Sequence, residues 1–147
     1  ACTCGNFGCV EQYTAPGAIA RRATREVRLG VPSVLSSYPV ITAAEVFKHA
    51  TSDHLCRHIV NDAVICLARA IWNLQQIFDP DVIVIGGGLV RAGTAFTEPL
   101  RAALASYYLA PELASRWTIK FSRLGDDAGI LGAARLAWNW LDGADRN

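Results

Sequence analysis

The chain has 147 residues, the size of one ordinary domain, and 52% of them are hydrophobic while 18% are charged. Such a composition supports a packed core and argues against intrinsic disorder. The formal net charge of +1 does not fit the strongly basic surface that nucleic-acid-binding domains usually present, and no apolar stretch reaches the roughly 20 residues of a membrane span.

The first part of the chain is predicted to be helical after an opening loop of cysteines and glycines. A helical pattern runs from Glu11 to Arg28, and Pro16 interrupts it near the start. Gly, Pro and Ser residues then mark a loop. Thr42, with Glu45 three residues later, forms a capping box, which predicts a short helix ending at about Ala50.

The middle of the chain is predicted to hold a long helix, a strand and a second helix. Apolar residues recur every three or four positions up to Phe78, and Asp53 is placed to cap this largely buried helix. The continuous apolar run from Val82 to Ile85 predicts a strand covered on both faces, as in parallel sheets. The next helix is expected from about Thr94 to Tyr107.

The last part of the chain is predicted to hold a strand and a closing helix. Alternating apolar residues from Trp117 to Leu124 predict the strand, and the helix should end near Leu141. We expect an aspartate of Gly125-Asp126-Asp127 to cap this helix, and Gly129 and Gly132 to let it approach a cleft closely. Strands that alternate with helices indicate an α/β sheet, whose remaining strands are expected from outside these residues.

Several features of the sequence suggest part of a longer protein. The chain contains no methionine, and its second residue already belongs to a motif. We therefore expect the C-terminal piece of a larger protein. No signal peptide is visible, and the cysteine usage favours a cytoplasmic location.

Three of the five cysteines lie together as Cys2-x-Cys4-x4-Cys9. Tight spacing of this kind in a largely apolar chain indicates metal binding in a reducing compartment. Thiolates at this spacing can surround one zinc ion, and the two glycines between them let the backbone fold tightly. A closed structural site needs four ligands and no His follows closely, so the fourth is expected from before residue 1. A disulfide such as Cys4 to Cys9 is the alternative.

The segment Cys2-x-Cys4-Gly5-x-x-Gly8-Cys9-x-Glu11 resembles the signature of the ROK family, which comprises repressors, open reading frames and kinases. The segments from Asp79 to Gly88 and from Leu124 to Ala134 resemble the family's second-lobe nucleotide strand and its closing helix, in the same order. The resemblance implies that residues 1–147 form the partial C-terminal lobe of an actin-like, ribonuclease-H-like ATPase fold with a zinc-binding loop. The N-terminal lobe would be absent from this chain.

The resemblance also implies how the cysteine motif works. Cys2, Cys4 and Cys9 would hold a structural zinc ion, completed in the family by a His of a Glu-x-Gly-His segment that this chain lacks. Glu11 would hydrogen-bond hydroxyls of a bound sugar, because a carboxylate can accept two donors at once. Its position near a helix N-terminus also has a purely structural reading, since the macrodipole favours a negative charge there.

A glycine run follows the first predicted strand and is assigned by the resemblance to the nucleotide side. Gly86, Gly87 and Gly88 would let the backbone approach a phosphate closely, although such a turn can also serve only as a tight connection. The run lacks the Lys and Ser or Thr of a P-loop, which excludes Walker-type binding.

Together these roles predict part of an ATP-dependent sugar kinase, a glucokinase-type phosphotransferase for a glucose-like hexose. The chain would supply the sugar wall, which is the side of the cleft that binds the sugar and is held in shape by the zinc ion. It would also supply part of the nucleotide site, with Mg-ATP as co-substrate of the intact protein. No catalytic residue is assigned: the family's base is an Asp of an Asn-Asp pair, and Asn61-Asp62 lies in the wrong part of the pattern. The chain alone is expected to be inactive, and the whole protein to form a homodimer.

Two other functions remain open from the sequence. A ROK transcriptional repressor would keep the same sugar lobe as a sensor and would contact nucleic acid only through a segment missing here. A zinc-braced domain used only for dimerisation is the third possibility. The residues that would distinguish them, and the choice of sugar, are expected outside these 147 residues.

Overall fold

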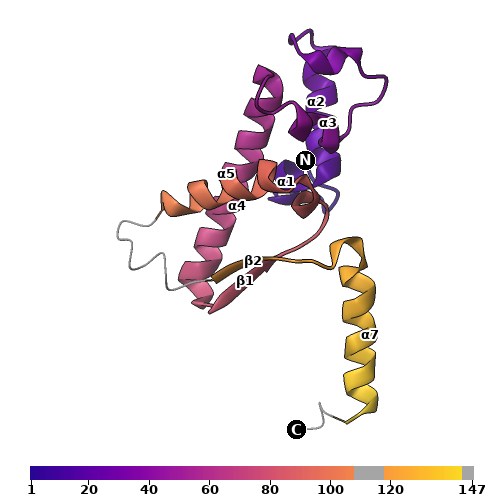
Figure 1. Cartoon of the computed structure of the whole chain (residues 1–147), viewed down its shortest axis with the longest axis vertical. Coiled ribbons are helices and arrows are strands. Elements are labelled where there is room, and N and C mark those ends of the chain that lie inside the picture. The colour runs from indigo at the N-terminus through magenta and orange to yellow at the C-terminus, as the bar shows by residue number, and fades with distance from the viewer. Residues whose placement is uncertain (108–117, 144–147) are drawn as a thin grey trace.

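The computed structural model describes residues 1–107 and 118–143. A helical body stands beside a short parallel sheet, and the closing helix α7 (Ala128–Leu141) extends away from both (Figure 1). The helical body is made of α2 (Pro16–Arg28), α3 (Ala43–Lys48), α4 (His54–Phe78) and α5 (Thr94–Ala105). The predicted Trp117 falls outside the described residues.

The predicted first helix is divided into α1 (Glu11–Thr14) and α2 (Pro16–Arg28). Pro16 occupies the first turn of α2, where its missing N–H costs nothing, and it holds the preceding Ala15 in an extended conformation. Ala18, Ile19 and Ala23 lie on the buried face of α2. The sequence therefore predicted both the helix and its interruption correctly.

A 3-10 turn, η1 (Val34–Ser37), and the short helix α3 (Ala43–Lys48) complete the upper part of the body. The capping box before α3 is confirmed, because Thr42 Oγ1 accepts a hydrogen bond from the N–H of Ala44 and Glu45 Oε2 accepts one from the N–H of Thr42 at 2.9 Å. Val46 and Phe47 point from α3 into the core.

The long helix α4 (His54–Phe78) is the central element of the body, with α2, α3 and α5 (Thr94–Ala105) packed against it. Its buried residues include Leu55, Ile59, Ala63 and Ile71, as the periodicity predicts. The helix was expected to be largely buried, and this fails at its C-terminal end, which projects past the other helices. Its apolar residues Leu74, Ile77 and Phe78 are exposed there.

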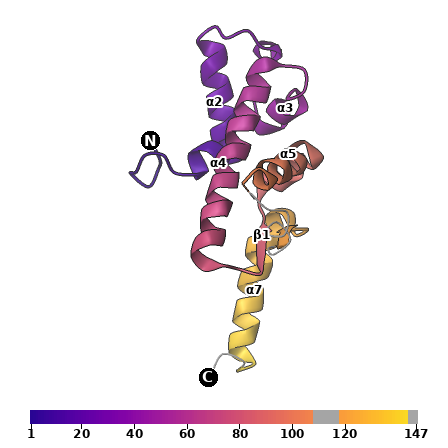
Figure 2. The same cartoon turned by 90° about the vertical axis from the view of Figure 1, so that its left-hand side faces the viewer.

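The sheet consists of β1 (Val82–Ile85) and β2 (Thr118–Phe121), which pair in parallel with Val82 opposite Thr118 and Ile85 opposite Phe121. The 3-10 segment η2 (Gly88–Ala92) and α5 connect them. Ile83 and Ile85 pack against the helical core, whereas Val84 is 63% exposed. The strand was expected to be covered on both faces, but the described helices cover only one (Figure 2).

The closing helix α7 (Ala128–Leu141) follows a 3-10 turn, η3 (Gly125–Asp127), and none of its residues is buried. Neither of two expectations about it is met by the residues that the structure describes. The Asp127 side chain accepts no capping hydrogen bond, because residue 127 is already helical and cannot take the extended conformation of a cap. A Cβ atom at Gly129 or Gly132 would meet nothing within 4 Å, so neither glycine allows a close approach among the described residues.

Among the described residues, no helix combines the length and the apolar character that crossing a membrane would require.

Candidate metal centre and substrate-facing surface

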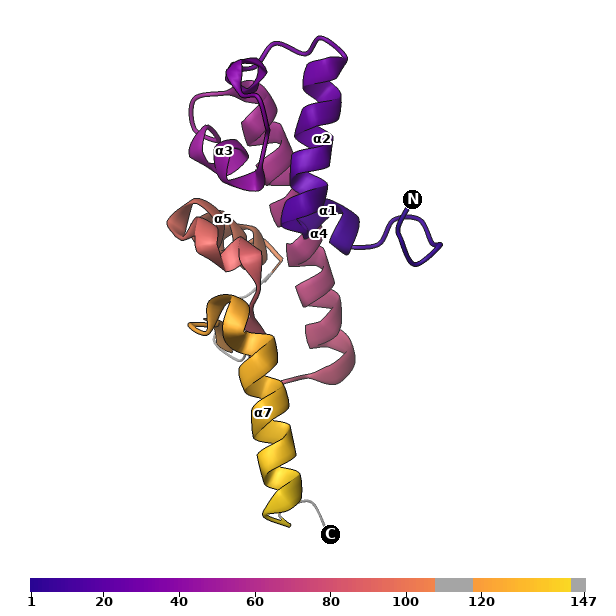
Figure 3. The same ribbon diagram turned by 90° about the vertical axis from the view of Figure 1, so that its right-hand side faces the viewer.

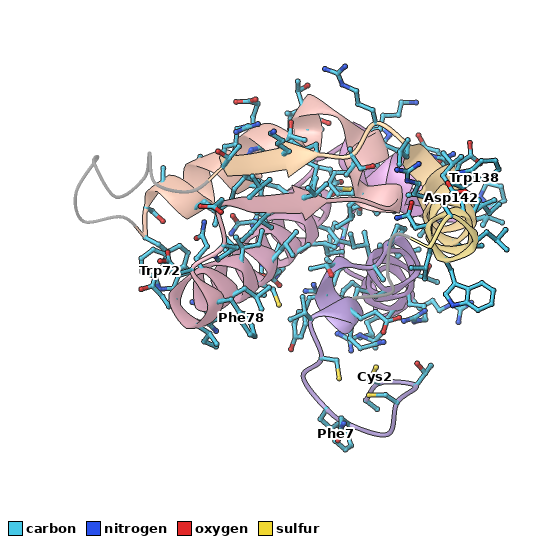
Figure 4. All side chains as sticks on the ribbon, turned by 90° about the horizontal axis from the view of Figure 1, so that it is seen from below. Cys2, Phe7, Trp72, Phe78, Trp138 and Asp142 are labelled. Carbon is cyan, nitrogen blue, oxygen red and sulfur yellow. The ribbon has the colours of Figure 1, made fainter. Side chains whose placement is uncertain are left out.

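The cysteine motif forms a loop that projects from α1, and Figure 4 shows its residues Cys2 and Phe7 away from the helices. The sulfur atoms of Cys2, Cys4 and Cys9 all lie within 4.8 Å of one another. The Cys4 and Cys9 sulfur atoms are 3.6 Å apart, and both cysteines are free, so the disulfide alternative is not realised in this structure. Tetrahedral zinc with Zn–S bonds of about 2.3 Å separates sulfur atoms by about 3.8 Å, which is close to the Cys4–Cys9 separation.

The backbone of the loop is folded to keep the three sulfur atoms together. The N–H of Cys2 donates to the carbonyl of Asn6 at 2.8 Å, and the N–H of Gly5 donates to the carbonyl of Cys2 at 3.0 Å. Gly5 has φ of +88°, a conformation that costs residues with a Cβ much more than it costs glycine. The geometry of the loop therefore depends on local turns rather than on burial.

The electrostatics of the cluster favour a cation at its centre. Hydrogen bonds from the backbone N–H and the side chain of Cys4 lower the pKa of Cys2 to about 7. Hydrogen bonds with the side chains of Cys4 and Cys2 raise the pKa of Cys9 to about 11. Three thiolates this close repel one another, so all three ionise together only when a metal ion lies between them.

Glu11 opens α1 beside this loop. Its side chain is exposed, and its Oε2 lies 4.0 Å from the sulfur atom of Cys2. Because α1 has only four residues, its macrodipole gives little reason for a carboxylate at this position. The carboxylate stands in solvent at the edge of the metal loop, where a ligand hydroxyl can reach it.

The glycine run Gly86 to Gly88 connects β1 to η2. Gly87 has φ of +83° and ψ of −171°, a conformation essentially limited to glycine. A Cβ atom at Gly88 would lie 2.9 Å from Cγ of Pro16, so the run packs directly against the start of α2. The structure thus brings the glycine run to the start of α2, which follows the short helix that Glu11 opens, a neighbourhood that no spacing in the sequence indicates.

A cavity of about 470 Å³ lies next to this contact, between the start of α2, α3, η2 and α5. Its lining includes Gly88, the apolar side chains of Phe47 and Leu89, and the cationic side chains of Lys48 and Arg91. An apolar wall with two cations is suited to an aromatic ring that carries anionic groups. Sequence reasoning missed Lys48 and Arg91, because they lie far apart in the sequence, on α3 and η2, and only the folded chain brings both to the lining of this cavity.

Asp62 and the two cysteines outside the motif, Cys56 and Cys66, belong to the helical body. Asp62 accepts a 2.6 Å hydrogen bond from Arg22 within the helical body, which agrees with the decision not to treat it as a base. Cys56 is fully buried, and burial raises the pKa of its thiol to about 12. Cys66 is half-buried, and burial also raises its pKa. Neither thiol belongs to the metal cluster.

Comparison with known proteins gives a consistent result. The family described as "ROK family" matches residues 1–139. A glucokinase of Halalkalibacterium halodurans is 35% identical over 140 residues, which is 92% of this chain and 42% of the relative. A xylose repressor of Caldicellulosiruptor bescii is 27% identical and covers 92% of this chain and 35% of the relative. The chain thus spans less than half the length of these relatives.

Among solved structures, a ROK family glucokinase from Streptomyces griseus in complex with glucose and AMPPNP superposes with a TM-score of 0.72. The match covers 90% of this chain and 45% of the glucokinase, at 24% sequence identity. This similarity confirms the fold class predicted from the sequence, a partial α/β lobe that carries the three-cysteine loop.

Proposed function

Because the chain belongs to the ROK family, we propose that it supplies the sugar-binding wall and part of the nucleotide site of an ATP-dependent kinase for a glucose-like hexose. The contact between Gly88 and Pro16 carries this proposal. Phosphoryl transfer depends mainly on holding donor and acceptor next to each other. That contact sets a glycine run suited to phosphates beside the start of α2, the helix that directly follows the short helix α1 opened by Glu11.

On the sugar side, Glu11 accepts hydrogen bonds from two sugar hydroxyls, which its exposed position beside the loop permits. Cys2, Cys4 and Cys9 hold a structural zinc ion that fixes this loop. The zinc ion contributes folding free energy to a segment that has almost no buried side chains of its own.

On the nucleotide side, the base lies against the apolar wall of the 470 Å³ cavity, and the phosphates of Mg-ATP approach Gly86 to Gly88. Lys48 and Arg91 at the cavity supply positive charge for those phosphates. We place residues 1–147 in the C-terminal lobe of a longer cytoplasmic, homodimeric enzyme, whose other lobe brings the catalytic base and the first phosphate loop.

The test is the affinity of the purified chain for AMPPNP, measured by calorimetric titration. Lys48→Ala should weaken binding about tenfold, the size expected for one hydrogen bond to a charged group. The matched control is Lys120→Ala, which removes the exposed lysine of β2, outside the cavity. Equal losses of AMPPNP affinity in the two variants, or no loss in Lys48→Ala, would show that the nucleotide does not bind in this cavity.

A sugar-sensing repressor is the second candidate, because the xylose repressor also matches 92% of the chain. The sugar wall would then work without nucleotide. A chain that binds glucose through Glu11 but has no measurable affinity for AMPPNP would favour the repressor over the kinase.

A further inference from the structure

A polar side chain of α1 contacts the candidate metal centre from outside the cysteine motif. Gln12 Nε2 donates a hydrogen bond to the Cys2 sulfur atom at 3.6 Å, and Gln12 Oε1 accepts one from Arg21 Nη2 at 3.1 Å. We propose that Gln12, oriented by Arg21, is a positioning residue that holds the Cys2 thiolate in place for the metal ion. The inference rests on the proposed zinc site and adds two residues to it.

The chemistry of glutamine fits this position. Its NH₂ group can only donate and its oxygen can only accept, so a guanidinium at the oxygen end leaves the NH₂ group directed at the sulfur. The backbone N–H of Gln12 also donates to the carbonyl of Cys9 at 2.9 Å. Gln12 therefore contacts residues at both ends of the motif, Cys2 and Cys9. If its side-chain amide were flipped, its oxygen would face the Cys2 thiolate and its NH₂ group would face the guanidinium of Arg21, which is also a donor.

The path of the Arg21 side chain depends on the helix surface beneath it. Residues 17 and 21 share one face of α2, and a Cβ atom at Gly17 would lie 3.4 Å from Arg21 Nη1. The guanidinium thus lies across the bare backbone at Gly17 and reaches back to Gln12. Since three thiolates and one Zn²⁺ leave an excess negative charge, a nearby guanidinium also offsets part of that charge.

The experiment compares zinc affinity of the full chain and its variants by competition with a chromophoric chelator. Gln12→Ala and Arg21→Met should each lower the affinity, by about 10- to 100-fold for Gln12→Ala, the usual effect of losing a hydrogen-bonding partner of a metal ligand. Gln12→Glu should lower it further, because it sets a carboxylate against the thiolate. The matched control is Arg25→Met, since Arg25 lies on α2 but pairs with Glu26.

A second readout separates positioning of the ligand from stability of the fold. In the Co²⁺-loaded chain, Gln12→Ala should shift the sulfur-to-cobalt charge-transfer band, while the urea midpoint of the metal-free chain stays within error of the wild type. A lower midpoint with an unchanged cobalt spectrum would overturn the proposal in favour of a purely structural role.

The remaining outcomes each test a different part of the idea. Wild-type zinc affinity in Gln12→Ala would reject the positioning role while leaving the metal site intact. A loss in Gln12→Ala that Arg21→Met does not share would reject the part assigned to Arg21. A wild-type chain that binds no zinc would overturn the metal site and this inference together.

Discussion

Replacing Asp53 by asparagine should destabilise the helical body and remove much of its sensitivity to acid. Asp53 is buried, and its two carboxylate oxygens accept hydrogen bonds from the N–H groups of Cys56 and Val34, each at 2.9 Å. Asp53 therefore caps α4 and also links the η1 segment to the start of α4 through the hydrogen bond from Val34. Burial by itself would raise the pKa of Asp53, but these two N–H groups lower it to about 2.

The lowered pKa of Asp53 sets how much stability its carboxylate contributes. A fall in pKa from 3.8 to about 2 corresponds to about 2.5 kcal/mol of stability, at roughly 1.4 kcal/mol per pKa unit. Because the folded pKa lies below the unfolded one, this stability is present above about pH 5 and is lost as the pH falls toward 2. In Asp53→Asn one of the two N–H groups faces an NH₂ group, which should cost about 1–3 kcal/mol at pH 7.

Urea unfolding followed by circular dichroism measures both effects, with chelator and reductant present so that metal loss does not contribute. Between pH 7 and pH 3 the wild type should lose about 1 kcal/mol more than Asp53→Asn. Asp81→Asn, at an exposed carboxylate before β1, is the control and should follow the wild type. Identical pH profiles for the wild type and Asp53→Asn would refute the reasoning.

Three further predictions concern the candidate site. Cys4→Ser should remove bound zinc while Cys66→Ser retains it, as measured by metal analysis; equal zinc in both would contradict the ligand assignment. Glu11→Gln should weaken glucose binding with zinc content unchanged, whereas Gly87→Val should weaken AMPPNP binding with little change in glucose affinity. If titrations showed instead that Glu11→Gln weakens AMPPNP binding and Gly87→Val weakens glucose binding, the assignments of the sugar and nucleotide sites would be reversed. Residues 1–147 alone should phosphorylate no sugar in an ATP-dependent assay, because the family's base and first phosphate loop are not among them, and turnover would mean that a base has been missed.

Local sequence signals predicted the elements well, because each depends on neighbours in the chain. The capping box at Thr42 and Glu45 and the break at Pro16 have such short-range causes, and both are confirmed. The three cysteines could be grouped from spacing alone, since the turns that join them are local.

Features that depend on distant packing could not be predicted in the same way. An apolar run such as Val82 to Ile85 indicates a strand but does not say which elements cover it, and Val84 is largely exposed. Only the folded chain brings Gly88 to Pro16 and lines the cavity beside Lys48 with residues from α2, α3, η2 and α5. Even a short-range signal failed at Asp127, because a residue that is already helical cannot act as a cap.

Among the described residues, half of the large apolar side chains left exposed lie on two segments, α7 and the end of α4. Trp138 and Trp140 on α7 are 61% and 71% exposed, and Phe78 at the end of α4 is 70% exposed. Figure 3 shows that α7 stands apart from the helical body, and the end of α4 also extends beyond it. Exposed apolar surface of this kind usually marks an interface or a tendency to associate.

The central claim is that sugar and nucleotide bind on either side of the contact between Pro16 and Gly88. A titration of the ¹⁵N-labelled, zinc-loaded chain with AMPPNP and then glucose, followed by backbone amide chemical shifts, tests it directly. We expect AMPPNP to move the amides of residues 42–48 and 86–92, and glucose to move those of residues 9–12, with Gly88 responding to both. Shifts confined to α7 or to the far end of α4, or none for either ligand, would contradict the claim.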